Sequence, residues 1–372
     1  MITTIAITPS NFEQILALDA DAFGYPLGTK TMYRRELVKN ATVYGDINDD
    51  TITSQVFALP LHVKLNTATV KMVGIGNVAS YPEVRGNGAI RRIMAQIQSD
   101  AYEDGAILSY LAPFSYRFYR QFGYEWLFDQ KQYTWDDHTV PIGAKTTPVK
   151  RASFDEALPT MKKIIGQHPD FQFGALARDD WWWRFRYTVR LSDLKIATTE
   201  NGYVMYRFEG DKLIIQELVT LTHDAELALW RFISSRAGTF KQFQLTDGQT
   251  TRDWRDLSTE PMAVKLQQQA GMMVRIVNIA ALLKILALPV EMVIDVTDDF
   301  EQNAGRWQMN GEKSTAIAQL SGTVQAWTKV LLHARRAEML LQTGELHGDI
   351  KSARRLDRVI DFSQRPVLAD YF

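Results

Sequence analysis

The chain of 372 residues is longer than an ordinary single domain and suits two or three domains. Hydrophobic residues make up 46% and charged residues 23%, and the formal net charge of −1 gives no overall electrostatic reason to expect nucleic acid or an anionic membrane as a partner. There is no cysteine, which excludes disulfides, zinc–thiolate sites, iron–sulfur clusters and cysteine nucleophiles.

The first segment of the chain has the pattern of a mixed α/β sheet. It begins with MITTIAITPSNFEQ, which lacks the basic and apolar regions of a signal peptide, so we expect a cytoplasmic protein. Its elements follow in the order strand, helix, strands, then strand–helix–strand, which is typical of mixed α/β folds. The expected strands are residues 3–7, 42–44, 55–65, 69–79, 107–111 and 126–135, and the expected helical segments are residues 10–22, with Ser10 as N-cap, 87–103 and 116–122.

Residues 140–151, VPIGAKTTPVKR, are rich in Pro, Gly and Thr and are predicted to link the first segment to a second α/β segment. In the second segment, the sequence DDWWWR places Trp181, Trp182 and Trp183 next to one another. Three adjacent residues cannot share one face of a helix or strand, so we expect a structural cluster rather than a surface that stacks carbohydrate. The other expected elements are helices at residues 155–165 and 225–237 and strands at residues 202–208 and 213–220.

A third region begins near Gly271. Its most apolar stretch, residues 276–294, is interrupted by polar and charged residues and by a proline. A membrane-spanning helix needs a longer and cleaner apolar run, so this stretch is predicted to be an amphipathic helix followed by a strand, and we expect no membrane span. The region also has an expected strand at 290–296, a turn at 303–305, helical stretches at 324–332 and 336–343, and four arginines expected to be solvated or interfacial, Arg335, Arg336, Arg354 and Arg355.

One loop in the first segment carries features of a phosphate site. Residues 76–94 read GNVASYPEVRGNGAIRRIM, in which a strand ends and Gly86 and Gly88 lead directly into a helix. Glycines let the backbone pass close to a ligand, and a helix start offers unpaired N–H donors and a partial positive charge. Arg85 and Arg91 add full charges. The alternative is a plain strand-to-helix turn, and the pattern is neither a Walker-type loop nor GxGxxG.

This loop resembles that of a known family. RGNGAI, residues 85–90, is similar to the acetyl-CoA pyrophosphate loop of the GNAT N-acetyltransferases, Arg/Gln-x-x-Gly-x-Gly/Ala, with Ile90 in place of the last small residue. Together with SYRFYRQFGYEW at 115–126, it resembles the Eis (enhanced intracellular survival) family, whose members acylate amines, including aminoglycosides. ELVTLTHDAELALWRFI at 217–233 resembles the second GNAT-like domain of that family, and MMVRIVNIAALL at 272–283 and DDFEQNAGRWQM at 298–309 resemble its sterol-carrier-like domain.

The resemblance covers essentially the whole chain. It implies two tandem GNAT-like mixed sheets followed by an α+β sterol-carrier-like domain, with a catalytic GNAT domain at residues 1–145, a second GNAT-like domain at 146–270 and the sterol-carrier-like domain at 271–372. It also implies acetyl-CoA as co-substrate and a homohexamer. No metal is expected, because the six histidines lack metal-ligand spacing: His62, His138, His168, His223, His333 and His347.

Acetyl transfer requires a base for the ammonium, an oxyanion site and an acid for the leaving thiolate. By resemblance, Tyr119 is the acid that protonates the CoA sulfur, and the base is the C-terminal carboxylate, borne here by Phe372. A carboxylate is a weak base unless it is partly desolvated or acts through water. The alternative for Phe372 is a hydrophobic anchor with an exposed carboxylate.

The resemblance also implies a set of cofactor contacts. The backbone of one strand is expected to hold the acetyl and pantetheine arm, the glycine loop is expected to contact the phosphates, and a third stretch is expected to form a second CoA contact. In that order the residues are Val78, Ala79 and Ser80; Arg85, Gly86, Asn87, Gly88, Ala89, Ile90 and Arg91; and Phe114 and Ser115.

The expected function is acetyl-CoA-dependent N-acetylation of a small cationic amine, similar to an aminoglycoside or a polyamine. One alternative is a lipid- or sterol-binding protein that uses the third domain, against which the intact glycine loop argues. Another is a protein or peptidyl-tRNA-linked acyltransferase, of which the RNA-linked form would favour a basic surface that the composition does not show. A cationic acceptor would need an acidic pocket, for which the candidates are Asp19, Asp21, Glu36 and Asp370.

Overall fold

The computed structural model describes residues 2–191, 193–249 and 251–372, and the chain divides into two compact units. Unit 1 consists of Met1–Leu127, Met272–Arg365 and Tyr371–Phe372, and unit 2 consists of Phe128–Gly271 and Pro366–Asp370. The chain therefore leaves unit 1 twice and returns to it for its last two residues.

The first sheet of unit 1 has the strand order β1-β2-β3-β4-β5-β15-β6. β4 and β5 pair in parallel, and the other neighbours along this order are antiparallel. β15 comes from the third region of the sequence and inserts between β5 and β6. The strands are β1 Ile2–Thr4, β2 Thr42–Asn48, β3 Thr51–Leu65, β4 Ala68–Ser80, β5 Leu108–Leu111, β6 Glu125–Trp126 and β15 Met273–Ile276.

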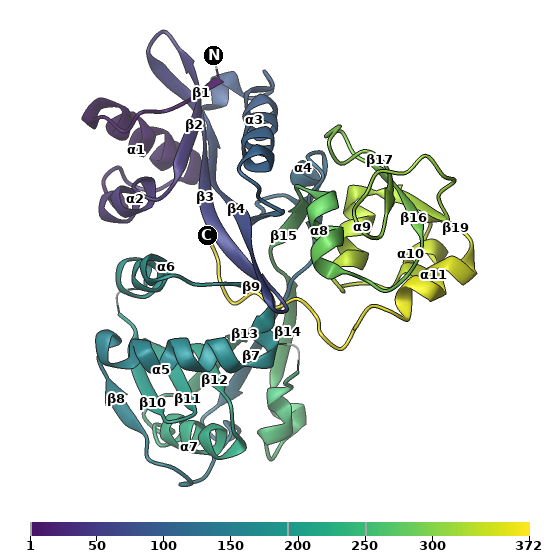
Figure 1. The fold of residues 1–372 in the computed structure, drawn as a ribbon. Coiled ribbons are helices and arrows are strands. Elements are labelled where there is room, and N and C mark those ends of the chain that lie inside the picture. Colours follow the sequence, from purple (N-terminus) through teal and green to yellow (C-terminus); the bar gives the residue numbers. More distant parts are fainter. Residues whose placement is uncertain (1, 192, 250) are drawn as a thin grey trace. The chain divides into compact units, whose positions relative to one another are not determined.

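Helices cover both faces of this sheet, with α1 and α2 on one side of β2–β4 and α3 on the other (Figure 1). α3 is strongly amphipathic, and its buried side chains pack on the strands. Burying each large apolar side chain contributes about 1.5–3 kcal/mol. The helices are α1 Pro9–Phe23, α2 Thr31–Val38, α3 Ala89–Glu103 and α4 Tyr116–Arg120, with a short 3-10 helix at Pro82–Val84.

The predicted N-cap of α1 is wrong by two residues. Thr8, not Ser10, caps the helix, and its hydroxyl accepts a hydrogen bond from the Asn11 N–H at 3.2 Å. Pro9 has no N–H to leave unpaired and therefore suits the first helical position, which makes the preceding residue the cap. α2 was not predicted, because its eight residues carry little apolar periodicity and Lys30 at its N-cap makes no capping hydrogen bond.

The rest of unit 1 is an α+β region with the sheet order β17-β16-β18-β19. The prediction of an amphipathic helix followed by a strand at 276–294 is confirmed by α8 and β16. Among the described residues, no helix is both long enough and apolar enough to cross a membrane. The elements are α8 Ile279–Leu286, β16 Val293–Thr297, β17 Gly305–Gln308, β18 Leu320–Thr323, α9 Val324–Leu331, α10 Ala337–Gln342, β19 Leu346–Gly348 and α11 Ile350–Asp357.

Unit 2 is built on the sheet order β14-β7-β13-β12-β11-β10-β8, in which only β12 and β13 pair in parallel. Its strands and helices are β7 Asp129–Asp136, β8 Lys150–Ala152, α5 Phe154–Gln167, β9 Phe173–Leu176, α6 Asp180–Arg184, β10 Lys195–Thr199, β11 Gly202–Glu209, β12 Lys212–Thr220, α7 His223–Ser234, β13 Gln242–Asp247 and β14 Lys265–Ala270. The single-turn helices are Pro169–Gln172, Trp254–Leu257 and Pro261–Ala263, and a π-helical segment runs from Phe185–Arg190.

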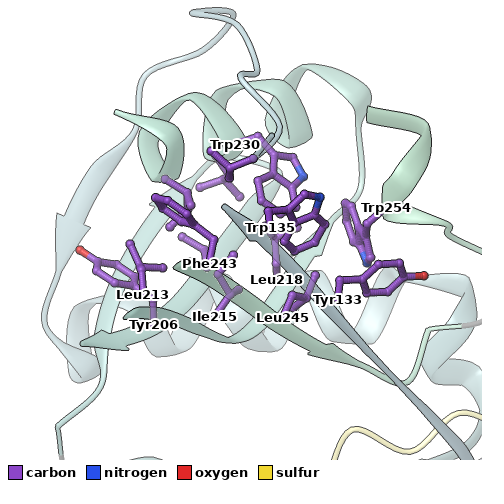
Figure 2. Close-up of a cluster of buried hydrophobic side chains, with 14 of the residues drawn as sticks. Tyr133, Trp135, Tyr206, Leu213, Ile215, Leu218, Trp230, Phe243, Leu245 and Trp254 are labelled. Carbon is purple, nitrogen blue, oxygen red and sulfur yellow. The ribbon is translucent and has the colours of Figure 1, made fainter. Parts of the chain in front are cut away.

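Large aromatic side chains fill the core between this sheet and α7, as Figure 2 shows. Trp135 from β7, Trp230 from α7 and Trp254 interlock at ring-centroid distances of 5.4 Å and 5.6 Å. The stretch predicted as a linker packs on the same helix, because Ser234 donates to the Ile142 carbonyl at 2.7 Å. That stretch is therefore an ordered part of unit 2. The prediction of a mixed α/β fold with two mixed sheets and an α+β region is confirmed.

Candidate active site

The two parallel strands of the first sheet separate at one end. Pairing of β4 with β5 ends at Ile75 and Leu111, but β4 runs on to Ser80 and stays paired with β3 on its other edge. Within the described residues, no β5 residue pairs with residues 76–80. One edge of this backbone segment, which includes the predicted contacts Val78, Ala79 and Ser80, is therefore open to a ligand.

The glycine loop presents backbone donors where α3 begins. Gly86 and Gly88 have φ values of 86° and 80°, a left-handed conformation that favours glycine. The Asn87 side chain accepts from the Ala89 N–H at 2.8 Å. Within the described residues, the N–H groups of Gly86, Gly88, Ile90 and Arg91 make no hydrogen bond. Four unpaired donors at a helix start form a site suited to an anion such as a phosphate.

Three arginines surround this loop. Arg85 is exposed and donates to the Ser80 carbonyl at 3.3 Å, and Arg91 donates to the Gln121 side chain at 2.5 Å. Arg92, which was not predicted, donates to the Asn87 carbonyl at 2.9 Å and pairs with Asp46 at 3.2 Å. Arg92 therefore holds the loop backbone, and the only sequence signal for it is its place in the first turn beside Arg91.

Tyr119, the predicted acid, lies on α4 with 2% of its surface exposed. Its ring packs on Phe114, which is itself exposed, and on Phe118 at centroid distances of 5.3 Å and 5.1 Å. Its hydroxyl makes no hydrogen bond within the described residues, although most buried tyrosine hydroxyls find a partner. Burial and the nearby hydroxyls of Tyr124 and Tyr371 raise the pKa of Tyr119 above its usual value near 10, so the phenol stays protonated.

α4 is held in place by a residue that was predicted to contact CoA. The Ser115 hydroxyl caps the helix by accepting from the Phe118 N–H at 3.2 Å. The hydrogen bond between Arg91 and Gln121, which follows α4, links this helix to the start of α3. The predicted acid and the predicted phosphate loop thus lie on elements that contact each other.

The C-terminal residue docks on β4. A methyl group added at Gly74 would lie 2.7 Å from the Cε2 atom of the Phe372 ring, and one added at Gly76 would lie 3.8 Å from its carboxyl carbon. Gly74 and Gly76 are two apart in a strand and therefore face the same side. The ring lies over Gly74 and the terminal carboxylate lies beside Gly76, where β4 and β5 part. The pair of glycines was missed, although alternate glycines in a strand signal close approach of another group.

The four predicted acidic candidates differ in their burial and in their partners. Asp19 is fully buried near β4 and is paired with Arg34. Asp370 is buried and ion-paired within unit 2, while Glu36 pairs with Lys39 at 2.5 Å and Asp21 is exposed. An ion-paired carboxylate is already neutralised, so Asp19, Glu36 and Asp370 are poor sites for a substrate cation.

Asp19 instead organises a buried polar cluster. Its carboxylate accepts from the Tyr25 hydroxyl at 2.7 Å and, more weakly, from Gln55 and Asn77 at 3.4 Å and 3.5 Å. Burial, reinforced by the Asp19 charge, raises the pKa of Tyr25 to about 12. Asn77 follows Gly76 with a φ of 50°, at the irregularity of β4 opposite β3. The cluster thus fixes the backbone beside the terminal carboxylate.

Two further observations concern other kinds of site. Among the described residues, no group of three or more His, Asp and Glu side chains is arranged to hold a metal ion. In the α+β region, an open groove of about 580 Å³ is lined by the end of α8, by residues 287–291 that follow it, and by Met309 and Asn310 after β17.

Comparison with known proteins decides the family. Residues 3–127 and 174–276 each match a model of an acetyltransferase (GNAT) domain, and residues 279–369 match a sterol carrier protein domain. A crystal structure from Enterococcus faecalis, described as a conserved protein of unknown function and probable N-acyltransferase, is 30% identical, covers 100% of both chains and has a TM-score of 0.92. The chain belongs to the GNAT acetyltransferases. This GNAT enzyme carries two GNAT domains and a C-terminal sterol carrier domain, as predicted.

More distant structures share the whole fold of this GNAT enzyme. A GCN5-related N-acetyltransferase from Anabaena variabilis is 20% identical with a TM-score of 0.87, and Eis1 from Mycobacterium abscessus is 18% identical with a TM-score of 0.84. Each covers 100% of both chains. Comparison with curated proteins found no match. Membership of the GNAT family implies use of acetyl-CoA, and the open edge of β4 and the free donors of the glycine loop fit that co-substrate.

Proposed function

We propose that this GNAT enzyme transfers the acetyl group of acetyl-CoA directly to an amine of a small cationic acceptor. The observation that carries the proposal is the set of four free N–H donors at the start of α3 beside the open edge of β4. The donors suit the pyrophosphate, and the open strand edge suits the amide groups of the pantetheine arm. When bound, acetyl-CoA supplies the thioester that is attacked.

Within this proposal, Gly86 to Arg91 and the Arg85 side chain bind the phosphates. Val78, Ala79 and Ser80 bind the pantetheine arm through their backbone groups. The exposed ring of Phe114 supplies an apolar contact to the cofactor. Ser115 acts mainly by capping the helix that carries Tyr119.

The acid and base roles follow from two groups near the end of the β4–β5 pairing. The Phe372 carboxylate accepts a proton from the substrate ammonium, and the free amine then attacks the thioester carbonyl. The C–S bond breaks, and the Tyr119 hydroxyl gives its proton to the sulfur. The nitrogen of the new amide loses its second proton, which restores the Tyr119 hydroxyl. Burial raises the pKa of Tyr119, which makes the phenol a weaker acid. The same apolar environment also disfavours the CoA thiolate, so transfer of the proton from the phenol to the sulfur stays possible.

A small cationic acceptor is favoured by the terminal carboxylate itself. It places a negative charge beside Gly76, and the next residue of the strand, Asn77, donates weakly to the buried Asp19 carboxylate. We expect polyamine-like or aminoglycoside-like amines to be acetylated faster than neutral amines or lysine peptides. The groove beside α8 would instead favour the lipid-binding alternative if it held a fatty acid while the enzyme failed to transfer acetyl groups.

The test is release of free thiol from acetyl-CoA across a panel of amines, with acetyl-CoA binding measured by calorimetry. We expect micromolar to millimolar binding and turnover with at least one cationic amine. A second arm extends the chain beyond Phe372, which converts the terminal carboxylate into an amide. The extended enzyme should bind acetyl-CoA normally and lose most of its kcat. Full activity of the extended enzyme would rule out the terminal base, and absence of both binding and turnover would rule out the proposed function.

A further inference from the structure

The second GNAT domain repeats the strand–helix–strand arrangement of the first. Its parallel strands β12 and β13 separate after the pair Ile215 and Leu245, just as β4 and β5 separate after their fourth pair. The helix that follows β12 has no glycine loop, and its first turn carries Asp224 and Glu226. Negative charges at a helix start oppose a phosphate, so this domain lacks the features that would bind acetyl-CoA.

The chain's own C-terminal tail packs where the second pair of strands separates. A methyl group added at Gly248, just after β13, would lie 2.9 Å from the Leu368 carbonyl oxygen. The Gln249 side chain donates to the Leu218 carbonyl at 3.0 Å and so bridges the two strands. The Val367 N–H donates to the Phe173 carbonyl at 3.0 Å, and both Val367 and Leu368 are buried. Tail residues 366–370 are thus built into unit 2.

The strongest contacts of the tail converge on Asp370, which is 2% exposed. Its carboxylate lies 3.0 Å from the Arg178 Nε and 3.5 Å from the Arg186 Nη1, and it accepts from the Trp182 indole N–H at 2.8 Å. Arg186 also donates to the Ala369 carbonyl at 2.6 Å. Three side chains from the segment that contains the three tryptophans therefore hold two consecutive tail residues.

A second buried carboxylate completes this network. Arg178 forms a bidentate pair with Glu217 on β12 at 3.0 Å and 2.8 Å, and its guanidinium lies 4.6 Å from the Trp183 ring. Burial opposes ionisation of Glu217, but Arg178 outweighs it and lowers the pKa of Glu217 to about 2. Buried ion pairs are weak evidence for stability, since desolvation offsets their attraction, but they do require one geometry. The tryptophan cluster, expected to be only structural, supplies a donor and a stacking face to this network.

We propose that the second GNAT domain is a clamp for the C-terminal tail, in which Arg178, Arg186 and Trp182 hold Asp370 and thereby position the terminal carboxylate. The proposal rests on the base role proposed for Phe372. Two residues separate Asp370 from the terminus, and a chain spans at most about 3.6 Å per residue. Holding Asp370 therefore leaves only two residues, or roughly 7 Å of chain, between the held backbone and the end of the chain. Asp370 is a positioning residue that acts through Phe372.

The first experiment compares Asp370→Asn in the full chain and in a chain that lacks Phe372. Asparagine keeps the shape of the side chain but lacks its charge. Arg178 keeps its ion pair with Glu217 in this variant. We expect Asp370→Asn to lower kcat at least tenfold with the acetyl-CoA Kd unchanged, and to cause no further loss once Phe372 is absent. Equal losses in both backgrounds would show that Asp370 does not act through the terminus. Trp182→Phe, which removes one donor, should give an intermediate loss even if the asparagine variant folds poorly.

The second experiment does not depend on catalysis. A carboxypeptidase that removes aromatic C-terminal residues is added, and loss of Phe372 and Tyr371 is followed by intact mass. We expect trimming to be at least tenfold faster in Asp370→Asn than in the unaltered chain. Glu226→Gln is the matched control, because Glu226 is a fully buried carboxylate of unit 2 that pairs with Arg252 and with no tail residue among those described. Equal trimming of Asp370→Asn and the unaltered chain would overturn the clamp.

The two experiments separate failure of the clamp from failure of the base. If removal of Phe372 leaves kcat at its original value, the Phe372 carboxylate is not the base, and the clamp has no catalytic role. If removal of Phe372 abolishes turnover but Asp370→Asn alters neither kcat nor the rate of trimming, the proposed base is supported and the proposed clamp is wrong.

Discussion

Tyr119 combines a buried ring with a hydroxyl that has no hydrogen-bond partner among the described residues. A substitution that removes only this hydroxyl therefore tests the proposed acid directly. We expect Tyr119→Phe to lower kcat by about 10²–10⁴-fold, because the proton for the thiolate is lost while the ring still fills its site. The acetyl-CoA Kd should change less than about twofold. Tyr116→Phe on the same helix is the control and should keep its rate. An unaltered rate in Tyr119→Phe would assign the acid elsewhere.

The two glycines under the terminal residue give a second prediction at this scale. A methyl group at Gly74 would come within 2.7 Å of the Phe372 ring and must displace it, whereas one at Gly76 meets the carboxyl carbon at an ordinary contact distance of 3.8 Å. We therefore expect Gly74→Ala to lower kcat at least tenfold and Gly76→Ala to lower it less, with acetyl-CoA binding intact in both. The reverse order, measured by steady-state kinetics, would contradict the docking of the terminus on β4.

At the scale of elements, α3 has a left-handed glycine at each end, and only one of them lies in the loop that we propose to bind the cofactor phosphates. Gly88 precedes the helix and Gly105 follows it, and both have a φ of 80°. Alanine at either position should lower stability by about 1–3 kcal/mol through backbone strain. Only Gly88→Ala should also weaken acetyl-CoA binding, by about tenfold in calorimetry, since it distorts the donors at the helix start. Equal affinities in the two variants would place the phosphates elsewhere.

The strand β13 carries a buried carboxyl group that should make the stability of unit 2 depend on pH. Burial raises the pKa of Asp247 from 3.8 to about 6, despite hydrogen bonds from Gln249 and Trp254. The folded state therefore binds the proton more tightly than the unfolded state. The resulting contribution to the free energy of unfolding is present below about pH 4 and is lost as the pH rises to about 6.

We expect Asp247→Asn to remove this loss, so that its free energy of unfolding relative to that of the unaltered chain rises by roughly 2 kcal/mol between pH 4 and pH 7. Urea unfolding followed by tryptophan fluorescence at several pH values measures it, because most of the tryptophans lie in unit 2. The exposed Asp211→Asn serves as control and should show no such trend. A pH-independent difference between Asp247→Asn and the unaltered chain would refute the assignment.

At the scale of the whole molecule, the resemblance to the Eis family predicts a homohexamer. Homo-oligomers form closed symmetric assemblies, so a single species with six times the mass of the chain is expected by analytical ultracentrifugation or native mass spectrometry. A stable monomer at micromolar concentration would contradict the prediction. The assembly and the predicted domain ranges of 1–145, 146–270 and 271–372 stay predictions.

The local features of the site could be predicted from the sequence. Gly86 and Gly88 between a proline and an apolar helical repeat indicate a strand-to-helix loop, and α3 follows from the periodicity of Ile93, Met94 and Ile97. Such signals depend on sterics and spacing over a few residues, which neighbouring positions set by themselves. The GNAT family itself was also accessible from this loop and the tyrosine-rich segment after it.

The remaining features depend on contacts between residues far apart in the chain. Three contacts join segments that are separated by tens to hundreds of positions. β15 pairs between β5 and β6, the Phe372 ring packs on Gly74, and Arg178 forms an ion pair with Asp370. No local pattern marks such partners, because each side chain alone is compatible with a solvated surface. The sequence by itself determined the family, and it named the glycine loop as a candidate phosphate site and Tyr119 as the candidate acid. Only the tertiary structure decided that the chain's own terminus is docked, because Gly74 and Gly76, on which Phe372 lies, are far from it in the sequence.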